Sequence, residues 1–399
     1  MPYNQEPSLR VLLLTTSFPL TSDASSGVFV ERLAQRLAQR CQLHVLAPAG
    51  REPVSMMHGI KYRLSTYRYA PARWQLLAHG GGGIPAALAA RPWLNVLVPL
   101  FIASMAIHCL WHARRADIIF ANWSICGVIA GVVGRLLGRP VVTTIRGEDA
   151  NRAASSFIHR WMIMLCLRLG GRVVTVSDDL VLCIKALFPS LVERVVMIPN
   201  GVDVMMEGEG SHEQSGDTAI RLLMIGSLIP RKSVATALSA LAKLPEQYSL
   251  TVLGDGVERE ALQKMVTHLD LGERVNFIGH VPPAEVSHWL AKADVLVMTS
   301  RSEGRPNAVL EAMAAGLPVV GSDIPGVREL VIPEVSGALF PVGHVDALVN
   351  CLLPLADESL RRRLGAGARR FINEQGLTWE NSAALYLRQF EQLLIERSV

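Results

Sequence analysis

Two glutamates separated by seven residues, Glu303 and Glu311, lie in a segment whose chemistry suits a polar, phosphate-bearing ligand. Upstream, residues 293–299 form a continuous apolar run that is typical of a buried parallel strand. Asn307 is a good N-cap, so we expect a helix to begin near Ala308. Unpaired N–H groups and the helix dipole favour a phosphate at that helix start. The two carboxylates beside it can accept hydrogen bonds from sugar hydroxyls.

Glu311 has an alternative role as the acid of a capping box. With Asn307 as N-cap, the box needs an acid at position 310, which is Leu310. Helix boundaries predicted from sequence are uncertain by a few residues, so capping stays open as the minor alternative.

A second group of polar residues follows another predicted strand, residues 221–225. Lys232 and Arg231 come shortly after its end, so they are placed to reach the carboxyl edge of the sheet, where α/β proteins bind ligands. A lysine beside a departing diphosphate stabilises the developing charge without a protonation step. The alternative for Lys232 is a solvated position at a helix N-terminus.

Polar residues also follow two predicted strands in the first half of the chain. Arg146, Glu148 and Asp149 come directly after residues 141–145, where charged side chains are placed to meet a substrate. Gly27 lies between the first strand and its helix, where a glycine lets the backbone approach a phosphate.

The pattern Glu, seven residues, Glu, followed by AMAAGLPVV, resembles the signature of retaining, nucleotide-sugar-dependent glycosyltransferases of family 4, which have the GT-B fold. The resemblance implies that Glu303 lies near the hydroxyls of the donor sugar and that Glu311 binds the nucleotide ribose. It implies catalytic roles for Glu303, Lys232 and Arg231. The donor-binding set that it implies is Gly27, Ser227, Glu311, Arg305, Pro306, Asn307, Ala308 and Val309.

The chain departs from the family pattern at three positions. Ser227 replaces an arginine, and Arg231 is its candidate substitute. Arg305 stands where the family often has an aromatic or aliphatic residue, and contact with a phosphate or a charged sugar is weighed equally with simple solvation. Arg146 replaces the histidine of a His-Gly-x-Asp motif, so no imidazole base is expected there. In the front-face mechanism of this family, the leaving phosphate oxygen takes the acceptor proton.

The arrangement Asn122-Trp123 followed by Arg146-Gly-x-Asp149 is similar to that of members that build bacterial cell-surface polysaccharides. Arg146, Glu148 and Asp149 are therefore assigned to the acceptor side, where Arg146 could bind a phosphate or an anionic acceptor.

Alternating apolar strands and helices predict an α/β fold with doubly wound sheets. The resemblance specifies GT-B, with two Rossmann-like domains facing across a cleft. We expect an N-terminal acceptor domain over residues 1–203, a linker at residues 204–218, and a donor domain over residues 219–378. The segment 379–399 is predicted to be a helix that either crosses back to the first domain or caps its own.

Composition sets further limits on the class of protein. The 399 residues carry a formal net charge of +4, with Lys and Arg spread along the chain, which disfavours a nucleic-acid partner. The six cysteines and eleven histidines show no metal-ligand spacing, so we expect free thiols and no metal or other cofactor. Hydrolase and NTPase motifs are absent from the sequence.

Residues 92–111 come close to the length that crosses a bilayer, but Asn95, Pro99, Ser104 and His108 interrupt the apolar run. A buried or interfacial helix is favoured, and arginines at its ends suit anionic lipid. No signal peptide is expected, which predicts a cytoplasmic protein, and peripheral contact with the membrane is left open.

We therefore expect an enzyme that moves a sugar, with retention, from a nucleotide-diphosphate sugar to a hydroxyl acceptor, a glycan or a lipid-linked sugar, in bacterial polysaccharide or glycolipid assembly. The alternatives are a non-catalytic nucleotide-sugar-binding subunit and a GT-B epimerase or hydrolase. The sequence leaves open the base, the sugar, the acceptor and the oligomeric state.

Overall fold

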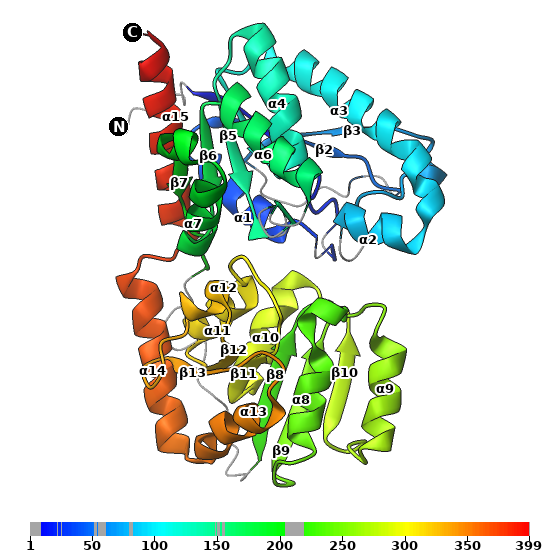
Figure 1. Ribbon diagram of the computed structural model, residues 1–399, viewed down its shortest axis with the longest axis vertical. Helices are drawn as coiled ribbons and strands as arrows, with labels where there is room; N and C mark the ends of the chain where they lie inside the picture. Colours follow the sequence, from blue (N-terminus) through cyan, green and yellow to red (C-terminus); the bar gives the residue numbers. More distant parts are fainter. Residues whose placement is uncertain are drawn as a thin grey trace. The chain divides into compact units, whose positions relative to one another are not determined.

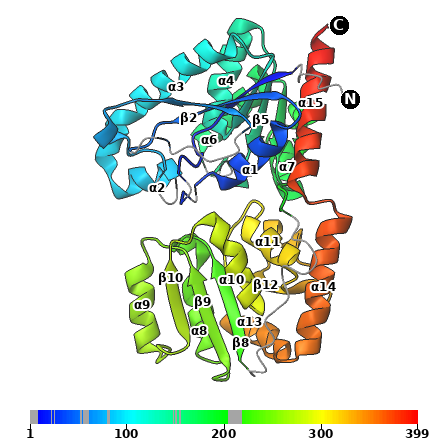
Figure 2. The same cartoon turned by 180° about the vertical axis from the view of Figure 1, so that it is seen from behind.

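The computed structural model describes residues 9–21, 23–24, 26–51, 54, 61–79, 83–147, 149, 152–153, 156–203 and 219–398. It divides into two compact units, which consist of residues 1–199 with 379–399 and of residues 200–378. Each unit is a parallel sheet with helices on its faces (Figure 1, Figure 2). The predicted linker, residues 204–218, lies outside the described residues.

The first unit contains a seven-stranded sheet in the order β3-β2-β1-β4-β5-β6-β7, in which every pair of neighbours is parallel. The chain reverses its direction of winding between β1 and β4, as in doubly wound folds. The strands are β1 (Arg10–Leu14), β2 (Gln42–Pro48), β3 (Arg63–Tyr67), β4 (Ile118–Asn122), β5 (Val141–Ile145), β6 (Arg172–Thr175) and β7 (Val195–Met197).

The helices of this unit are α1 (Val28–Leu37), α2 (Gly83–Ala90), α3 (Val98–Ala113), α4 (Ser124–Leu137), α6 (Phe157–Leu169), α7 (Asp178–Leu187) and α15 (Trp379–Ser398). Short 3₁₀ helices are η1 (Ala72–Trp74), η2 (Pro92–Leu97) and η3 (Pro189–Arg194). Successive strand residues point to opposite faces, so each strand contributes to two cores. Leu13 packs with α1 and α15 on one face, whereas Leu12 packs with α3 and α4 on the other.

Helix α15 is the segment whose position the sequence left open. It packs on the first unit, because Tyr386 and Phe390 lie against Phe120 of β4. The hydroxyl of Ser382 also donates to the carbonyl oxygen of Pro199 at 2.7 Å. The end of the chain is therefore part of the core of the first unit.

The second unit contains a six-stranded parallel sheet in the order β10-β9-β8-β11-β12-β13. Its strands are β8 (Ile220–Ile225), β9 (Tyr248–Leu253), β10 (Val275–Gly279), β11 (Val295–Met298), β12 (Val319–Ser322) and β13 (Gly337–Phe340). Its helices are α8 (Val234–Leu241), α9 (Arg259–His268), α10 (Val286–Lys292), α11 (Asn307–Ala315), α12 (Pro325–Arg328), α13 (Val345–Leu352) and α14 (Glu358–Glu374), with η4 (Pro230–Lys232), η5 (Pro283–Glu285) and η6 (Leu353–Ala356). The expected Rossmann-like topology is confirmed in both units.

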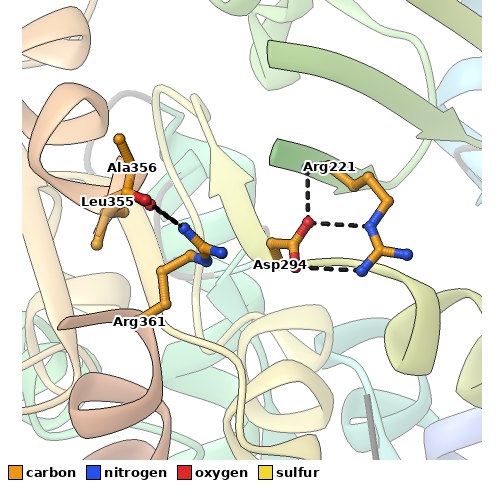
Figure 3. A network of polar contacts seen from close by, with 5 residues as sticks. All are labelled: Arg221, Asp294, Leu355, Ala356 and Arg361. Carbon is orange, nitrogen blue, oxygen red and sulfur yellow. Dashed lines mark hydrogen bonds and ion pairs between the residues drawn. The ribbon is translucent and has the colours of Figure 1, made fainter. Parts of the chain in front are cut away.

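The same arginine–aspartate clamp fixes the two central strands of each sheet at their amino ends. In the second unit, Asp294 accepts hydrogen bonds from the backbone N–H of Arg221 at 2.8 Å and from its Nε at 3.0 Å (Figure 3). In the first unit, Asp117 accepts the matching bonds from Arg10 at 2.9 and 3.1 Å. In the first turn of α14, Arg361 donates to the carbonyl oxygens of Leu355 and Ala356 (Figure 3). The clamps leave the carboxyl ends of these strands for ligands.

The cysteines are free thiols, as expected. Cys183 and Cys351 are partly exposed, and the other four are buried.

Candidate active site

The candidate donor site lies at the carboxyl ends of β8 and β11 in the second unit. These adjacent strands flank the position where the winding direction reverses, which is where open α/β sheets bind ligands. The loop after β8 carries Arg231 and Lys232, and the loop after β11 carries Glu303.

The structure brings the three residues with predicted catalytic roles together. The Nζ atom of Lys232 donates to Oε1 of Glu303 at 2.6 Å. Nη1 of Arg231 lies 3.8 Å from the other carboxylate oxygen of Glu303 and donates to the carbonyl oxygen of Ser302 at 3.3 Å. The Lys232 ammonium is therefore held in the site, and a simple solvated position is wrong.

Glu303 is ionised in this environment. Its side chain is only 10% exposed, and burial alone would raise its pKa. The charge of Lys232, the hydrogen bond from Lys232, the charge of Arg231 and a hydrogen bond from Ser300 outweigh burial and lower the pKa below the ordinary 4.5. The site thus offers a carboxylate acceptor and a cation side by side.

Backbone contacts hold the two loops in register. The hydroxyl of Thr299 lies 2.9 Å from the carbonyl oxygens of both Lys232 and Ser233, and the N–H of Arg301 donates to the carbonyl oxygen of Arg231 at 2.8 Å. Gly226 follows β8 with a φ of 151°, and a Cβ atom there would lie 3.2 Å from Cε of Lys232. The next residue, Ser227, is partly buried at the start of the same loop.

The start of α11 differs from the prediction. The N-cap is Pro306, and Asn307 is the first helical residue, without a side-chain cap. The side chain of Asn307 instead accepts a hydrogen bond from Nδ2 of Asn200 at 2.9 Å. Helix geometry still leaves the N–H groups of Asn307 and Ala308 without an acceptor inside the helix, so both suit a phosphate.

The remaining donor-site residues on α11 lie close to this helix start. Pro306 accepts from the N–H of Val309 at 3.1 Å, which closes the first turn. Glu311 follows one turn later and is partly exposed. With Pro306 as N-cap the capping-box acid would fall at Val309, so the capping role of Glu311 is excluded.

The side chain of Arg305 is buried, so the alternative of simple solvation is wrong. Its side chain is 6% exposed, and Nη1 lies 3.2 Å from Oε2 of Glu329 at the end of α12. An arginine whose fork is held by a carboxylate fixes the loop between Glu303 and α11. Its predicted contact with the donor stays a prediction.

Gly326 contributes to the shape of the site and was not predicted from the sequence. A Cβ atom on this residue would lie 2.5 Å from the carbonyl oxygen of Gly304 and 2.7 Å from that of Glu303. The backbone of α12 therefore packs directly on the loop between β11 and α11, which carries Glu303 and which we call the glutamate loop. The sequence signal was present as Ile-Pro-Gly after a strand, but nothing local indicated what this glycine approaches.

In the first unit, Gly27 precedes α1 with a φ of 82°. A Cβ atom at Gly27 would lie 2.5 Å from the carbonyl carbon of Ser17, so the loop after β1 closes tightly over the helix start. Glycine is therefore required here by the approach of the Ser17 backbone, and the predicted contact of Gly27 with a phosphate stays a prediction.

Arg146 follows β5 and is only 6% exposed. Its Cζ atom lies 4.1 Å from the ring centroid of Phe29 and 5.9 Å from that of Trp123, and Nη2 donates to Oδ1 of Asn122 at 3.2 Å. Burial lowers the pKa of Arg146 to about 10, so the guanidinium still carries its charge at neutral pH. Trp123 itself has a φ of 78°, a strained conformation for a bulky residue.

Asp149 binds the first residue of α4. Its carboxylate accepts from the hydroxyl of Ser124 at 2.6 Å and from the N–H of Ser124 at 3.2 Å, at the first residue of that helix. Burial raises the pKa of Asp149, while these bonds lower it. Glu148 lies outside the described residues.

Known proteins identify the class of this chain. The model for glycosyltransferase family 4 matches residues 26–205, and the model for glycosyl transferases group 1 matches residues 211–371. The chain is a glycosyltransferase with the GT-B fold. UDP-Gal:alpha-D-GlcNAc-diphosphoundecaprenol alpha-1,3-galactosyltransferase of Escherichia coli is 26% identical over 289 residues, 67% of this chain and 73% of that protein.

Solved structures agree with this glycosyltransferase fold. The structure of Anabaena HepE in complex with UDP and glucose has a TM-score of 0.76 and 20% identity, covering 96% of this chain and 100% of that chain. Sucrose-phosphate synthase of Thermosynechococcus elongatus has a TM-score of 0.77 and 20% identity, covering 97% of this chain and 100% of that chain. These structures confirm the predicted fold. The family models and the Escherichia coli relative confirm the predicted class, so the binding-subunit and epimerase or hydrolase alternatives are not favoured.

The described part of the glycosyltransferase contains no group of three or more His, Cys, Asp or Glu side chains that could hold a metal ion. The expectation of transfer without a metal stays a prediction.

Proposed function

We propose that this glycosyltransferase moves a hexose, with retention at the anomeric carbon, from a nucleotide-diphosphate sugar to a hydroxyl acceptor. The observation that carries the proposal is the Lys232–Glu303 pair beside the start of α11, at the reversal point of the second sheet. It combines a cation and free helix N–H groups for a diphosphate with a buried carboxylate for sugar hydroxyls.

A UDP-sugar is the first candidate for the donor. Two observations support it: HepE was solved with UDP, and the Escherichia coli relative is named for UDP-Gal. In this proposal Glu311 binds the ribose, the N–H groups at the start of α11 bind the diphosphate, and Glu303 binds the sugar. Lys232 and Arg231 stabilise the charge that develops on the leaving diphosphate.

The transfer step needs no protein base. The bond between the anomeric carbon and the diphosphate oxygen breaks, and the acceptor oxygen forms its bond on the same face of the sugar. The acceptor hydroxyl gives its proton to the phosphate oxygen that separates from the sugar. The protonated leaving group is the nucleoside diphosphate. Arg146 is no substitute for a base, because it stays protonated at neutral pH with a pKa of about 10.

For the acceptor, we propose a lipid-linked sugar of bacterial polysaccharide or glycolipid assembly. The Escherichia coli relative carries an acceptor of this kind in its name, and a relative from Rhizobium meliloti is named for lipopolysaccharide core biosynthesis. We place the reaction in the cytoplasm, where nucleotide sugars are available, with Arg146 and Trp123 on the acceptor side.

The test incubates the protein with UDP-, GDP-, ADP- and dTDP-sugars and a diphosphate-linked lipid sugar, and determines the new linkage by NMR. The proposal predicts a product with the anomeric configuration of the donor, formed only when acceptor is present. An inverted product would contradict retention. Donor consumption that is equal with and without acceptor would instead indicate a hydrolase.

A further inference from the structure

The outer side of α3 and η2 carries a row of exposed apolar side chains. The inner stripe contains Leu97, Phe101 and Met105, which are buried against the first sheet. A second stripe points outward at helical spacing and is exposed: Trp93 53%, Val96 76%, Leu100 53%, Ile107 66% and Trp111 64%. A surface helix that is hydrophobic on both sides normally has its outer side covered as well.

The apolar surface continues onto the two helices beside α3. Helix α4 packs between α3 and α6 on one face of the first sheet (Figure 1, Figure 2). The exposed apolar side chains on these helices are Val132 and Leu136 of α4 and Phe157, Ile158 and Trp161 of α6. We refer to the outer surface of η2, α3, α4 and α6 as the three-helix face.

The charge of the three-helix face is entirely positive. Helices α3, α4 and α6 and η2 contain no Asp or Glu. Arg135 and Arg168 are exposed on α4 and α6, and exposed arginines flank α3 at both ends, at positions 91, 114 and 115. By contrast, α15 on the opposite face of the sheet contains three glutamates.

Aromatic residues lie at the ends of the apolar stripe. Trp93 precedes α3 and Trp111 lies in its last turn, where Cζ of Arg114 is 5.7 Å from the indole centroid. Tryptophan and arginine with this spacing are typical of the boundary between lipid head groups and acyl chains.

We propose that the three-helix face binds the surface of an anionic lipid bilayer, with its apolar stripe in the acyl boundary and its arginines among the phosphates. The occupant follows from charge and composition, because apolar side chains, terminal tryptophans and unopposed arginines together complement anionic lipid. A protein partner would have to be acidic and apolar at once over the same area.

The helix lies on the membrane in this proposal and does not cross it. Pro92–Ala113 is long and apolar enough to span a bilayer, by length and composition. Its inner stripe, however, is part of the core of the first unit, because Phe101 packs edge-to-face against both Tyr67 and Tyr69. Crossing would require that core to open, whereas lying flat leaves it intact.

This inference deepens the proposed function, since a lipid-linked acceptor resides in a membrane, but its test measures lipid binding alone. The purified full chain is sedimented with phosphatidylcholine vesicles that contain or lack phosphatidylglycerol, in the absence of any donor. Ile107→Glu is compared with Ile395→Glu, because both isoleucines are 66% exposed and Ile395 lies on α15, on the other face of the sheet. A second variant, Arg135→Glu/Arg168→Glu, reverses two charges without changing the apolar stripe.

The proposal predicts strong binding only to vesicles with phosphatidylglycerol, weakened by added salt. The double arginine variant should bind at least about tenfold more weakly, since each arginine near an anionic surface is worth roughly a fivefold factor. Ile107→Glu should weaken binding by at least about tenfold as well, because it places a carboxylate in the apolar stripe. Ile395→Glu should bind as the unchanged protein does. Thermal unfolding of each variant checks that the fold is retained.

Three results would overturn the proposal. The first is no sedimentation with anionic vesicles, and the second is equal loss of binding in the Ile107 and Ile395 variants. The third is a dimer in sedimentation velocity that Ile107→Glu converts to a monomer without any vesicle binding, which would assign the face to a second copy. Sugar transfer can be measured separately with a water-soluble acceptor, which needs no membrane. The membrane proposal and the proposed function can therefore fail independently.

Discussion

Nζ of Lys232 lies 2.6 Å from Oε1 of Glu303 and joins the loops that follow the two central strands of the second sheet. The contact places a fixed cation and a buried carboxylate at the point where the sheet reverses its winding. Removing one member therefore affects both the charge of the site and the positions of the two loops.

Lys232→Ala should destabilise the protein by about 2 kcal/mol, because it leaves the Glu303 carboxylate buried without its main partner. It should also weaken donor binding. Urea unfolding measures the first effect, and Lys232→Ala/Glu303→Gln is the control, since removing the unpaired charge should recover part of the lost stability.

The Lys232–Glu303 pair also makes the free energy of unfolding depend on pH. The pKa of Glu303 is lowered below 4.5 in the folded protein, so its contribution to stability is present above that pH and is lost as the pH falls through the lowered pKa. The difference in unfolding free energy between the unchanged protein and Lys232→Ala should be largest at neutral pH and shrink below 4.5. If the difference in unfolding free energy were the same at neutral pH and below pH 4.5, the pair would make no electrostatic contribution to stability.

Gly326→Ala should lower the turnover number at least about tenfold, because its Cβ atom would push on the carbonyl oxygens of Gly304 and Glu303 and shift the glutamate loop. Gly272→Ala is the matched control, since a Cβ atom there meets nothing within 4 Å. Steady-state kinetics of both variants decides the matter. Full activity of Gly326→Ala would mean that the loop position is unimportant.

Arg146→Lys should cost about 1–2 kcal/mol of stability, because an ammonium cannot reproduce both the stacking on Phe29 at 4.1 Å and the bond to Asn122. Arg73→Lys is the comparison: Arg73 also lies over an aromatic ring, 5.5 Å from the Trp74 centroid, but that tryptophan is exposed. Its substitution should change the stability by less than about 0.5 kcal/mol. Equal effects in chemical denaturation would contradict the special role of Arg146.

Asp149→Ala should destabilise the protein by about 1–2 kcal/mol through loss of the bonds to Ser124 at the start of α4. Asp149→Asn keeps an acceptor oxygen and should lie close to the unchanged protein in both stability and turnover. If Asp149→Asn folds normally but loses transfer to the acceptor, the carboxylate has a direct role in the reaction.

Much of the fold could be predicted, because the central strands are short apolar runs and the helices between them have clear periodicity. Strand β3 (RLSTY) was missed, since only Tyr67 is buried in this edge strand and its polar residues carry no strong signal. Helix α7 was likewise not predicted, although Ser177 and the two aspartates after it are a recognisable helix start.

The residues of the donor site could be predicted from the sequence, but the contacts that hold them could not. Local rules favour Asn307 as an N-cap, yet its side chain bonds to Asn200, which is 107 positions away. In the same way, Arg305 is held by Glu329, and the close approach of Gly326 to the glutamate loop depends on how α12 packs. Such partners come from tertiary packing, which no short stretch of sequence encodes.

The most direct test of the donor site is thermal stabilisation of the purified protein by UDP-, GDP-, ADP- and dTDP-sugars, because a ligand that binds the folded state raises the unfolding midpoint. Glu260→Ala, which removes a glutamate from the first turn of α9 in the same unit, is the matched control for Glu311→Ala. We predict a shift with one nucleotide, most readily UDP, that Glu311→Ala abolishes and Glu260→Ala preserves. A shift that survives both Glu311→Ala and Lys232→Ala would place the donor elsewhere and contradict this account.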